Sequence, residues 1–138
     1  MEPYWISYRL TFNSKSTSLD FISSSASHNP YIRHDIEGLA LLPPYYLVAS
    51  SQGNFSYSVF DRRTKEYLTS FKVMNRSSID GVEETDGIEI MALPLGDQLE
   101  HGIFVAQDGF NYQDSTLVRQ NFKIVKLEEI QNLLRSYK

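Results

Sequence analysis

Residues 38–73, GLALLPPYYLVASSQGNFSYSVFDRRTKEYLTSFKV, alternate between short apolar runs and turn-rich segments. Short aliphatic and aromatic runs bounded by proline, glycine, asparagine or serine are typical of β-strands. The four runs are Leu39–Leu42, Tyr45–Ala49, Ser56–Phe60 and Tyr67–Val73. Because the turns between them are short, we expect an antiparallel meander in which each strand lies beside the next.

A second group of strand-like runs follows this meander. Its members are Ile88–Leu93, Gly102–Gln107 and Phe122–Val125, separated by turn-rich connections at Pro94–His101 and Asp108–Gln120. They predict another antiparallel sheet with one strand fewer, whose remaining edge would need a strand from elsewhere. A meander of roughly forty residues has the size of one propeller blade. From spacing alone, propeller blades and free-standing meanders both remain open.

The two ends of the chain have different patterns. Residues Tyr4–Phe12 alternate between two faces, which indicates a strand buried mainly on one side. The serine-rich segment Asn13–Asn29 is interpreted as a long connection. Near the C-terminus, apolar residues recur at helical spacing, namely Leu127, Ile130, Leu134 and Tyr137. The sequence thus predicts an all-β fold followed by a short amphipathic helix.

The composition narrows the functions open to the chain. Its 138 residues, 41% of them hydrophobic, are enough for one domain with its own core. A formal net charge of -4 and a pI near 5.3 argue against nucleic acid as a partner and suit a cation binder. The absence of cysteine excludes disulfides and thiolate zinc sites. With no apolar run of roughly 20 residues and no visible export signal, we expect a soluble chain with no membrane partner.

Three turns combine acidic residues with glycine beside an apolar strand. They are Asp35-Ile36-Glu37-Gly38, the loop Asp80–Glu89 that contains Thr85-Asp86-Gly87, and Gln107-Asp108-Gly109 with Asn111 just after. Crowded carboxylates repel one another unless a cation lies among them. Each turn is therefore either a solvated surface turn or part of a cation site, and the residues alone leave both open.

Five segments in register resemble the C-terminal part of the β-propeller phytases. They are Asp35-Ile36-Glu37-Gly38-Leu39, Ser50-Ser51-Gln52-Gly53-Asn54 with Ser56-Tyr57, Asp80-Gly81 with Thr85-Asp86-Gly87-Ile88, Phe104-Val105-Ala106-Gln107-Asp108-Gly109 with Asn111, and Asn121-Phe122-Lys123. The resemblance covers roughly residues 31–134. It implies a partial β-propeller that holds the last blades of a six-bladed propeller. On that view residues 1–34 are a residual strand and linker, 35–75 one blade, 76–126 a second blade, and 127–138 the helix.

The resemblance also implies calcium-dependent hydrolysis of phytate (myo-inositol hexakisphosphate) or other inositol phosphates, with several Ca²⁺ ions bound. A metal-activated water would attack the phosphate. The calcium ligands on the catalytic face would be Asp35, Glu37 and Asp86. The ligands in or near the central channel would be Gln52 and Asp80. The ligands of a structural calcium ion would be Asp108 and Asn111.

The chain departs from the family's pattern at Phe110, which stands where a glutamate ligand is usual. A phenylalanine offers no oxygen to calcium, so this departure weakens the prediction of the structural ion. Glu84 and Glu89 stand where aspartates are usual, which keeps the charge and lengthens the side chain by one methylene.

Three functions stay open at this point. The first is the phytase reaction, completed by propeller blades that a longer chain or a partner would supply. The second is an inactive calcium- or phosphate-binding fragment, which would expose blade faces and be prone to self-association. The third, from paired carboxylates alone, is a glycosidase. The family resemblance suggests secretion.

Overall fold

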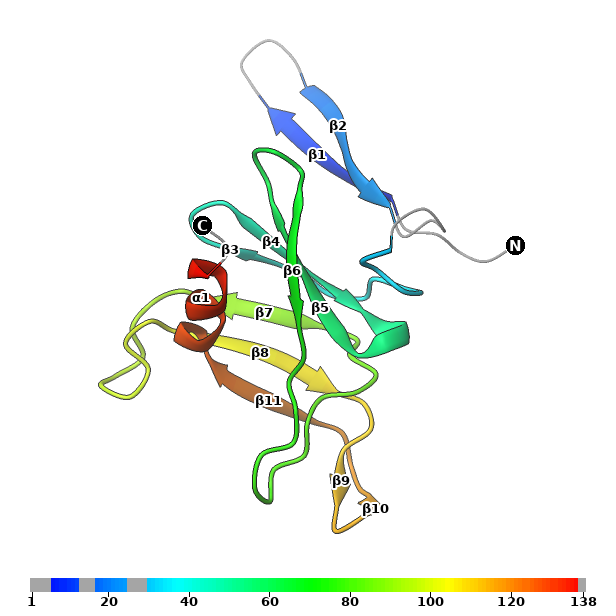
Figure 1. Cartoon of the computed structure of the whole chain (residues 1–138), viewed down its shortest axis with the longest axis vertical. Helices are drawn as coiled ribbons and strands as arrows, with labels where there is room; N and C mark the ends of the chain where they lie inside the picture. The colour runs from blue at the N-terminus through cyan, green and yellow to red at the C-terminus, as the bar shows by residue number, and fades with distance from the viewer. Residues whose placement is uncertain (1–5, 13–16, 25–29, 137–138) are drawn as a thin grey trace.

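The computed structural model of the chain describes residues 6–12, 17–24 and 30–136. This part of the chain is mostly antiparallel sheet, with one short helix near the C-terminus, as Figure 1 shows. The predicted all-β class is confirmed. No helix in the described ranges is long and apolar enough to cross a bilayer.

The predicted meander forms a four-stranded sheet in the order β3-β4-β5-β6. Its strands are β3 (Leu39–Leu42), β4 (Tyr46–Ser51), β5 (Ser56–Asp61) and β6 (Tyr67–Phe71). Each strand pairs antiparallel with the next, as the short turns predicted. A single 3-10 turn, η1 (Gln52–Asn54), connects β4 to β5. Phe55 after it has a φ of 53°, so this turn works without glycine at its left-handed position.

The second predicted sheet has three strands in the order β11-β8-β7. They are β7 (Ile88–Met91), β8 (Ile103–Asp108) and β11 (Asn121–Lys126). The connection predicted at residues 108–120 also contains a small hairpin, β9 (Tyr112–Gln113) and β10 (Thr116–Leu117). Its two turn residues, Asp114 and Ser115, both have positive φ, which suits the tight turn of a hairpin.

The prediction of a long connection at residues 13–29 was wrong in its middle. Strand β2 (Thr17–Ser24) forms there and pairs antiparallel with β1 (Ile6–Phe12). Serine favours turns in a local reading, but backbone pairing with a neighbouring strand overrides that preference. Tyr4, Trp5 and Tyr137, expected at the ends of the N-terminal strand and of the helix, lie outside the described residues.

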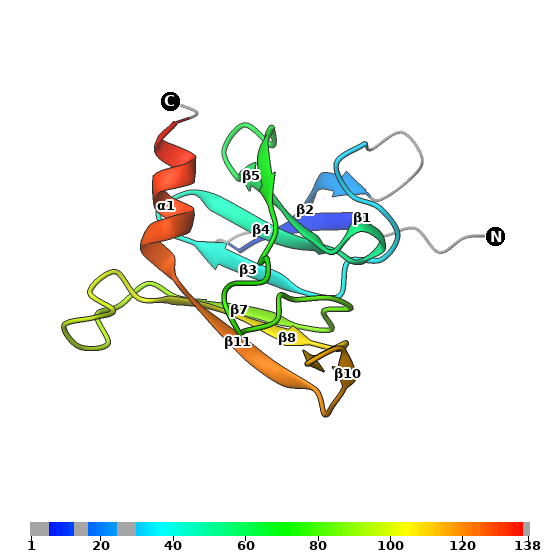
Figure 2. The same ribbon diagram turned by 60° about the horizontal axis from the view of Figure 1, so that its bottom comes forward.

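The main core lies between the two sheets and is closed at one end by α1 (Leu127–Arg135), as Figures 1 and 2 show. Successive side chains of a strand point to opposite faces of its sheet, so one set from each strand points into this core. All six residues of β5 are buried, because Ile32, Ile36, Ala49 and Phe60 form a second apolar cluster on the other face of the first sheet. The buried apolar residues are Ala40, Leu42, Val48, Tyr57, Val59, Val82, Ile90, Phe104, Ala106, Leu127, Ile130 and Leu134. The predicted helix is confirmed, and it buries three of the four residues that predicted it.

Leu134→Ala is expected to lower the free energy of unfolding by about 2–3 kcal/mol, because the leucine side chain is only 4% exposed and its loss leaves a cavity. Urea denaturation of both proteins measures the difference. The matched control is Asn132→Ala on the exposed side of the same helix, which should change stability by less than about 0.5 kcal/mol. Equal effects of the two substitutions would mean that the helix does not pack on the sheets.

Candidate functional site

Two strand starts bring the first and second acidic turns together. Glu37 and Gly38 immediately precede β3, and Asp86 lies two residues before Ile88, where β7 begins. A Cβ added to Gly38 would lie 2.9 Å from both the backbone nitrogen and the Cγ1 of Ile88. The backbones can approach this closely only because residue 38 has no side chain. The Ser50 hydroxyl oxygen accepts hydrogen bonds from the amides of Glu37 (2.9 Å) and Gly38 (2.8 Å) and holds this strand start in place.

A cluster of carboxylates results at this edge. A side-chain hydrogen bond to Asp86 raises the pKa of Glu37, and desolvation and repulsion from Asp86, Asp35 and Glu84 add to the rise. Glu37 and Asp86 are both exposed, and Asp35 and Glu84 are partly buried. Like charges this close repel one another, and a bound proton or cation would reduce this repulsion.

Gln52 lies beside this cluster. Its backbone amide donates to the carbonyl oxygen of Asp35 at 3.2 Å, which ties η1 to the first acidic turn. The structure therefore brings four of the seven predicted site residues to one edge of the molecule, namely Asp35, Glu37, Gln52 and Asp86.

The acidic loop, residues 80–89, is held to the end of β8 by its backbone. The Gly109 amide donates to the carbonyl oxygen of Glu83 at 2.8 Å. A Cβ added to Gly109 would lie 2.5 Å from the carbonyl oxygen of Glu84. The glycine of the third acidic turn thus serves the close packing of the second turn against it.

Side chains from both sheets also anchor this loop. The hydroxyl groups of Tyr57 and Thr85 are hydrogen-bonded at 2.7 Å, and both residues are buried. Burial raises the pKa of Tyr57 to about 12, so the phenol stays neutral at ordinary pH. The amide of Asp86 donates to Gln107 Oε1 at 2.7 Å, and the amide of Gln107 donates to the carbonyl oxygen of Gly87 at 3.0 Å. The chain is therefore fixed on both sides of Asp86.

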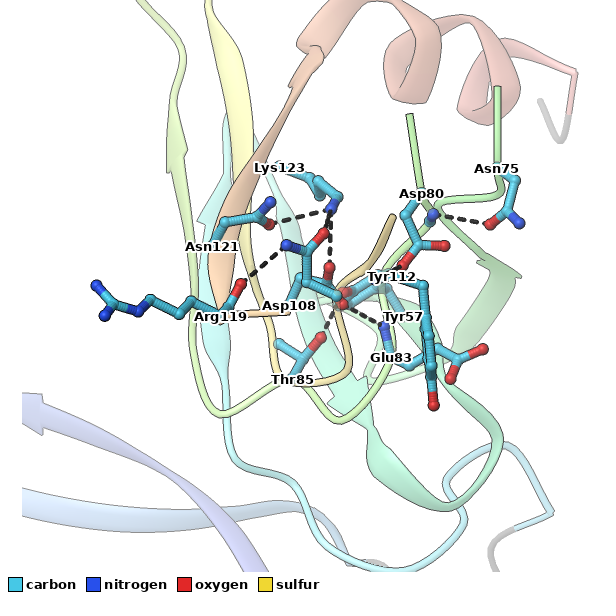
Figure 3. A network of polar contacts seen from close by, with 12 residues as sticks. Tyr57, Asn75, Asp80, Glu83, Thr85, Asp108, Tyr112, Arg119, Asn121 and Lys123 are labelled. Atoms are coloured by element: carbon cyan, nitrogen blue, oxygen red, sulfur yellow. Dashed lines mark hydrogen bonds and ion pairs between the residues drawn. The ribbon is translucent and has the colours of Figure 1, made fainter. Parts of the chain in front are cut away.

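The third acidic turn surrounds a buried ammonium group, shown in Figure 3. Lys123 Nζ donates to Asp108 Oδ2 (2.8 Å), Asn111 Oδ1 (2.9 Å) and Asn121 Oδ1 (3.0 Å). Asp108 is fully buried, and its other oxygen accepts the amide of Glu83 at 3.1 Å. Both oxygens of the Asp108 carboxylate thus have partners within the chain.

Asp80 lies with Asp108, Asn111 and Lys123, which form a second group separate from the cluster around Asp86. Its carboxylate accepts the amide of Tyr112 at 2.6 Å, which links the acidic loop to the β9–β10 hairpin (Figure 3). Asp80, Asn111 and Lys123 all line one groove of about 1180 Å³. The seven predicted residues are therefore divided between two places.

Sequence reasoning missed Lys123, Tyr57, Thr85 and Gln107 as parts of these arrangements. A signal for Lys123 was present, since its neighbours Phe122 and Ile124 are apolar and strand alternation places the lysine on the opposite face. The structure buries Lys123 at 8% exposure and leaves Phe122 and Ile124 at 69% and 64%.

The cluster around Asp86 does not form a ready-made group of three metal-binding side chains. Within the described residues, no three histidine, aspartate or glutamate side chains have that arrangement. Calcium also accepts amide and backbone carbonyl oxygens, so carboxylates alone need not complete a site.

A family model of the phytases matches residues 16–137 of the chain. The chain belongs to the phytase family. A 3-phytase from Bacillus subtilis (strain 168) is 44% identical to this phytase-family chain over 105 residues, which cover 72% of the chain and 28% of the relative. The resemblance stated from the five segments is confirmed. The chain spans less than a third of the length of this curated relative.

Proposed function

We propose that this chain contributes one wall of a calcium-dependent site that hydrolyses phosphate monoesters of phytate. The observation that carries the proposal is the exposed carboxylate pair Glu37 and Asp86, with Asp35 and Glu84 close enough to raise the Glu37 pKa further. Family membership and the similarity to a 3-phytase support the choice of substrate class. Phytate or other inositol phosphates would be the partners.

The donor chemistry of this edge fits calcium. Calcium takes six to eight oxygen ligands drawn from carboxylates, amide oxygens and backbone carbonyls. Asp35, Glu37 and Asp86 would supply carboxylates, and Gln52 would supply an amide oxygen from the adjoining turn. A divalent ion would also relieve the repulsion that now raises the pKa of Glu37.

The residues of the chain would bind and orient the reactants. Bound calcium would supply charge neutralisation for the phosphate and a lowered pKa for water. Asp86 would be held in place by its anchored backbone while its exposed side chain faces solvent. The hydrogen bond to Asp86 and the neighbouring carboxylates raise the pKa of Glu37, and Glu37 would release its proton on binding calcium.

Calcium ligation by the second group has a competing partner. The oxygens of Asp108 and Asn111 contact the Lys123 ammonium, which already supplies positive charge. A structural calcium ion at these two residues stays a prediction, and it requires a rearrangement of Lys123. Asp80 has a partly buried carboxylate that one backbone amide contacts, so it remains the better proposed ligand of this group.

We also propose that the two sheets are neighbouring propeller blades. Strands β3 and β7 approach each other closely at Gly38 and Ile88. Apolar side chains are exposed on the outer strands and faces, namely Leu39, Leu41, Phe122 and Ile124. Further blades, from a longer chain, a partner or self-association, would cover such surfaces. An enzyme of this family would then be expected outside the cell.

The alternative is a fragment that binds calcium without turning substrate over. Its support is that the similarity to the 3-phytase covers only 28% of that relative. Phytate hydrolysis assayed with and without calcium separates the two functions, because the alternative predicts binding without phosphate release.

Calorimetric titration with calcium tests the premise that both functions share. The chain is expected to bind calcium at submillimolar to millimolar concentration, and Asp86→Ala is expected to weaken this binding by at least about tenfold. Asp97→Ala, an exposed acidic residue in the connection at the other end of β7 and β8, is the matched control and should bind normally. No heat at millimolar calcium would contradict both functions.

A further inference from the structure

We propose that Gln107 and Thr85 are positioning residues that aim the Asp86 carboxylate at the calcium site, an inference that rests on the proposed function. Thr85 precedes Asp86 and is tied to β5 through the Tyr57 hydroxyl. Gln107 belongs to β8 and holds the amide of Asp86 with its side chain and the carbonyl of Gly87 with its backbone. The Thr85 side chain is thus anchored to β5, whereas the Asp86 amide and the Gly87 carbonyl are anchored to β8 of the other sheet.

The need for such anchors follows from charge. Asp86 is exposed, and the close approach of Gly38 to Gly87 and Ile88 brings it near the carboxylate of Glu37, where two ionised groups repel each other. A metal ligand binds its ion more tightly when neighbouring groups hold the ligand in position before the ion arrives. Gln107 and Thr85 oppose the repulsion through the backbone of the loop.

The Thr85 anchor is rigid because its partner is rigid. Tyr57 is 2% exposed and its ring packs against Phe104 (centroids 5.0 Å apart) and Phe71 (5.2 Å). The position of its hydroxyl group is therefore determined by the core. Thr85 itself is 7% exposed, so water does not compete readily for this hydrogen bond.

The side-chain amide of Gln107 lowers the stability of the fold, because one of its two polar atoms lacks a partner. Its Nε2 is buried and lacks a hydrogen-bond partner in the described part of the chain. Turning the amide over would place Nε2, a donor, against the donating amide of Asp86, so the observed orientation is the one the loop requires. A buried donor without a partner lowers stability. An apolar side chain of the same length would avoid this cost, which indicates that the acceptor oxygen serves the loop.

Paired substitutions separate positioning from folding. Gln107→Met removes the acceptor and keeps the length, whereas Gln107→Glu keeps an acceptor oxygen. Thr85→Val removes the hydroxyl and keeps the shape, whereas Thr85→Ser restores a hydroxyl. Calcium affinity is measured by calorimetry, and the melting temperature is measured in calcium-free buffer.

We expect Gln107→Met and Thr85→Val each to weaken calcium binding by about tenfold, the lower end of the effect of groups that orient metal ligands. Gln107→Met should melt no lower than the unchanged chain, because it removes the unpartnered donor. Gln107→Glu and Thr85→Ser should bind calcium within about threefold of the unchanged chain. Gln98→Met, in the exposed connection at the far end of β7 and β8, is the control and should leave calcium affinity unaltered.

Asp86→Ala is titrated in parallel to tell the two proposals apart. If Asp86→Ala weakens binding while Gln107→Met and Thr85→Val do not, the positioning role is wrong and the calcium site stands. If Asp86→Ala binds normally, the calcium site itself is wrong. If Gln107→Met and Thr85→Val weaken binding without rescue by Gln107→Glu and Thr85→Ser, the effect is structural and positioning is rejected. Should Thr85→Val fail to fold, the Gln107 pair decides alone.

Discussion

Lys123→Met is expected to lower the free energy of unfolding by about 3–5 kcal/mol, the cost of removing one partner from a buried ion pair. Asp108 is fully buried, and its carboxylate would lose the ammonium that lies 2.8 Å from Oδ2. Asn111 and Asn121 would lose the same donor, which frees the third acidic turn from β11. Urea denaturation measures the loss.

Two further variants identify the cause. Lys126→Met lies on the same strand but is exposed, so its effect should stay within about 0.5 kcal/mol. Combining Lys123→Met with Asp108→Asn leaves no lone charge in the interior, and this double variant should be more stable than Lys123→Met alone. A loss below about 1 kcal/mol for Lys123→Met would mean that water reaches the pair and screens it.

Asp86→Ala is expected to lower phytate hydrolysis by about a hundredfold or more in a phytase that is long enough to be active. A suitable protein is the Bacillus subtilis 3-phytase in which this chain replaces the matching 28% of the sequence. The reason is that the substitution would remove one exposed carboxylate of the proposed calcium site, next to Glu37. The measurement is phosphate release from phytate in the presence of calcium.

The chimera needs its own controls. Asp97→Ala removes an exposed carboxylate at the other end of β7 and β8 and should leave the rate unchanged. A chimera that releases phosphate as fast with Asp86→Ala as without it would refute the catalytic placement of Asp86. A folded chimera that binds calcium and releases no phosphate would favour the alternative of a binding segment.

Local sequence patterns predicted the strands of the two main sheets, because strand formation there follows from the alternation and turn residues of neighbouring positions. The turns predicted at 43–44, 51–54 and 62–65 lie between the strands of the first sheet, except that Ser51 ends β4. The observed strand bounds differ from the predicted ones by two residues or fewer. Strand β2 escaped prediction because its serine-rich segment is ordered by pairing with β1, which local sequence does not record. The β9–β10 hairpin also escaped prediction, because strands of only two residues are too short to show an alternating pattern.

The site residues show the same contrast between what the local sequence predicts and what tertiary contacts decide. The sequence by itself determined the all-β class, the strands of the two main sheets, the C-terminal helix and membership in the phytase family, because alternation, turn residues and motifs depend on neighbouring residues. Only the tertiary structure decided that Glu37 meets Asp86, that Asp108 meets Lys123, and that Gln107 and Thr85 hold the loop between them. These contacts join residues that are not neighbours in the chain, and strand pairing within the second sheet and the packing of the two sheets decide which of them meet.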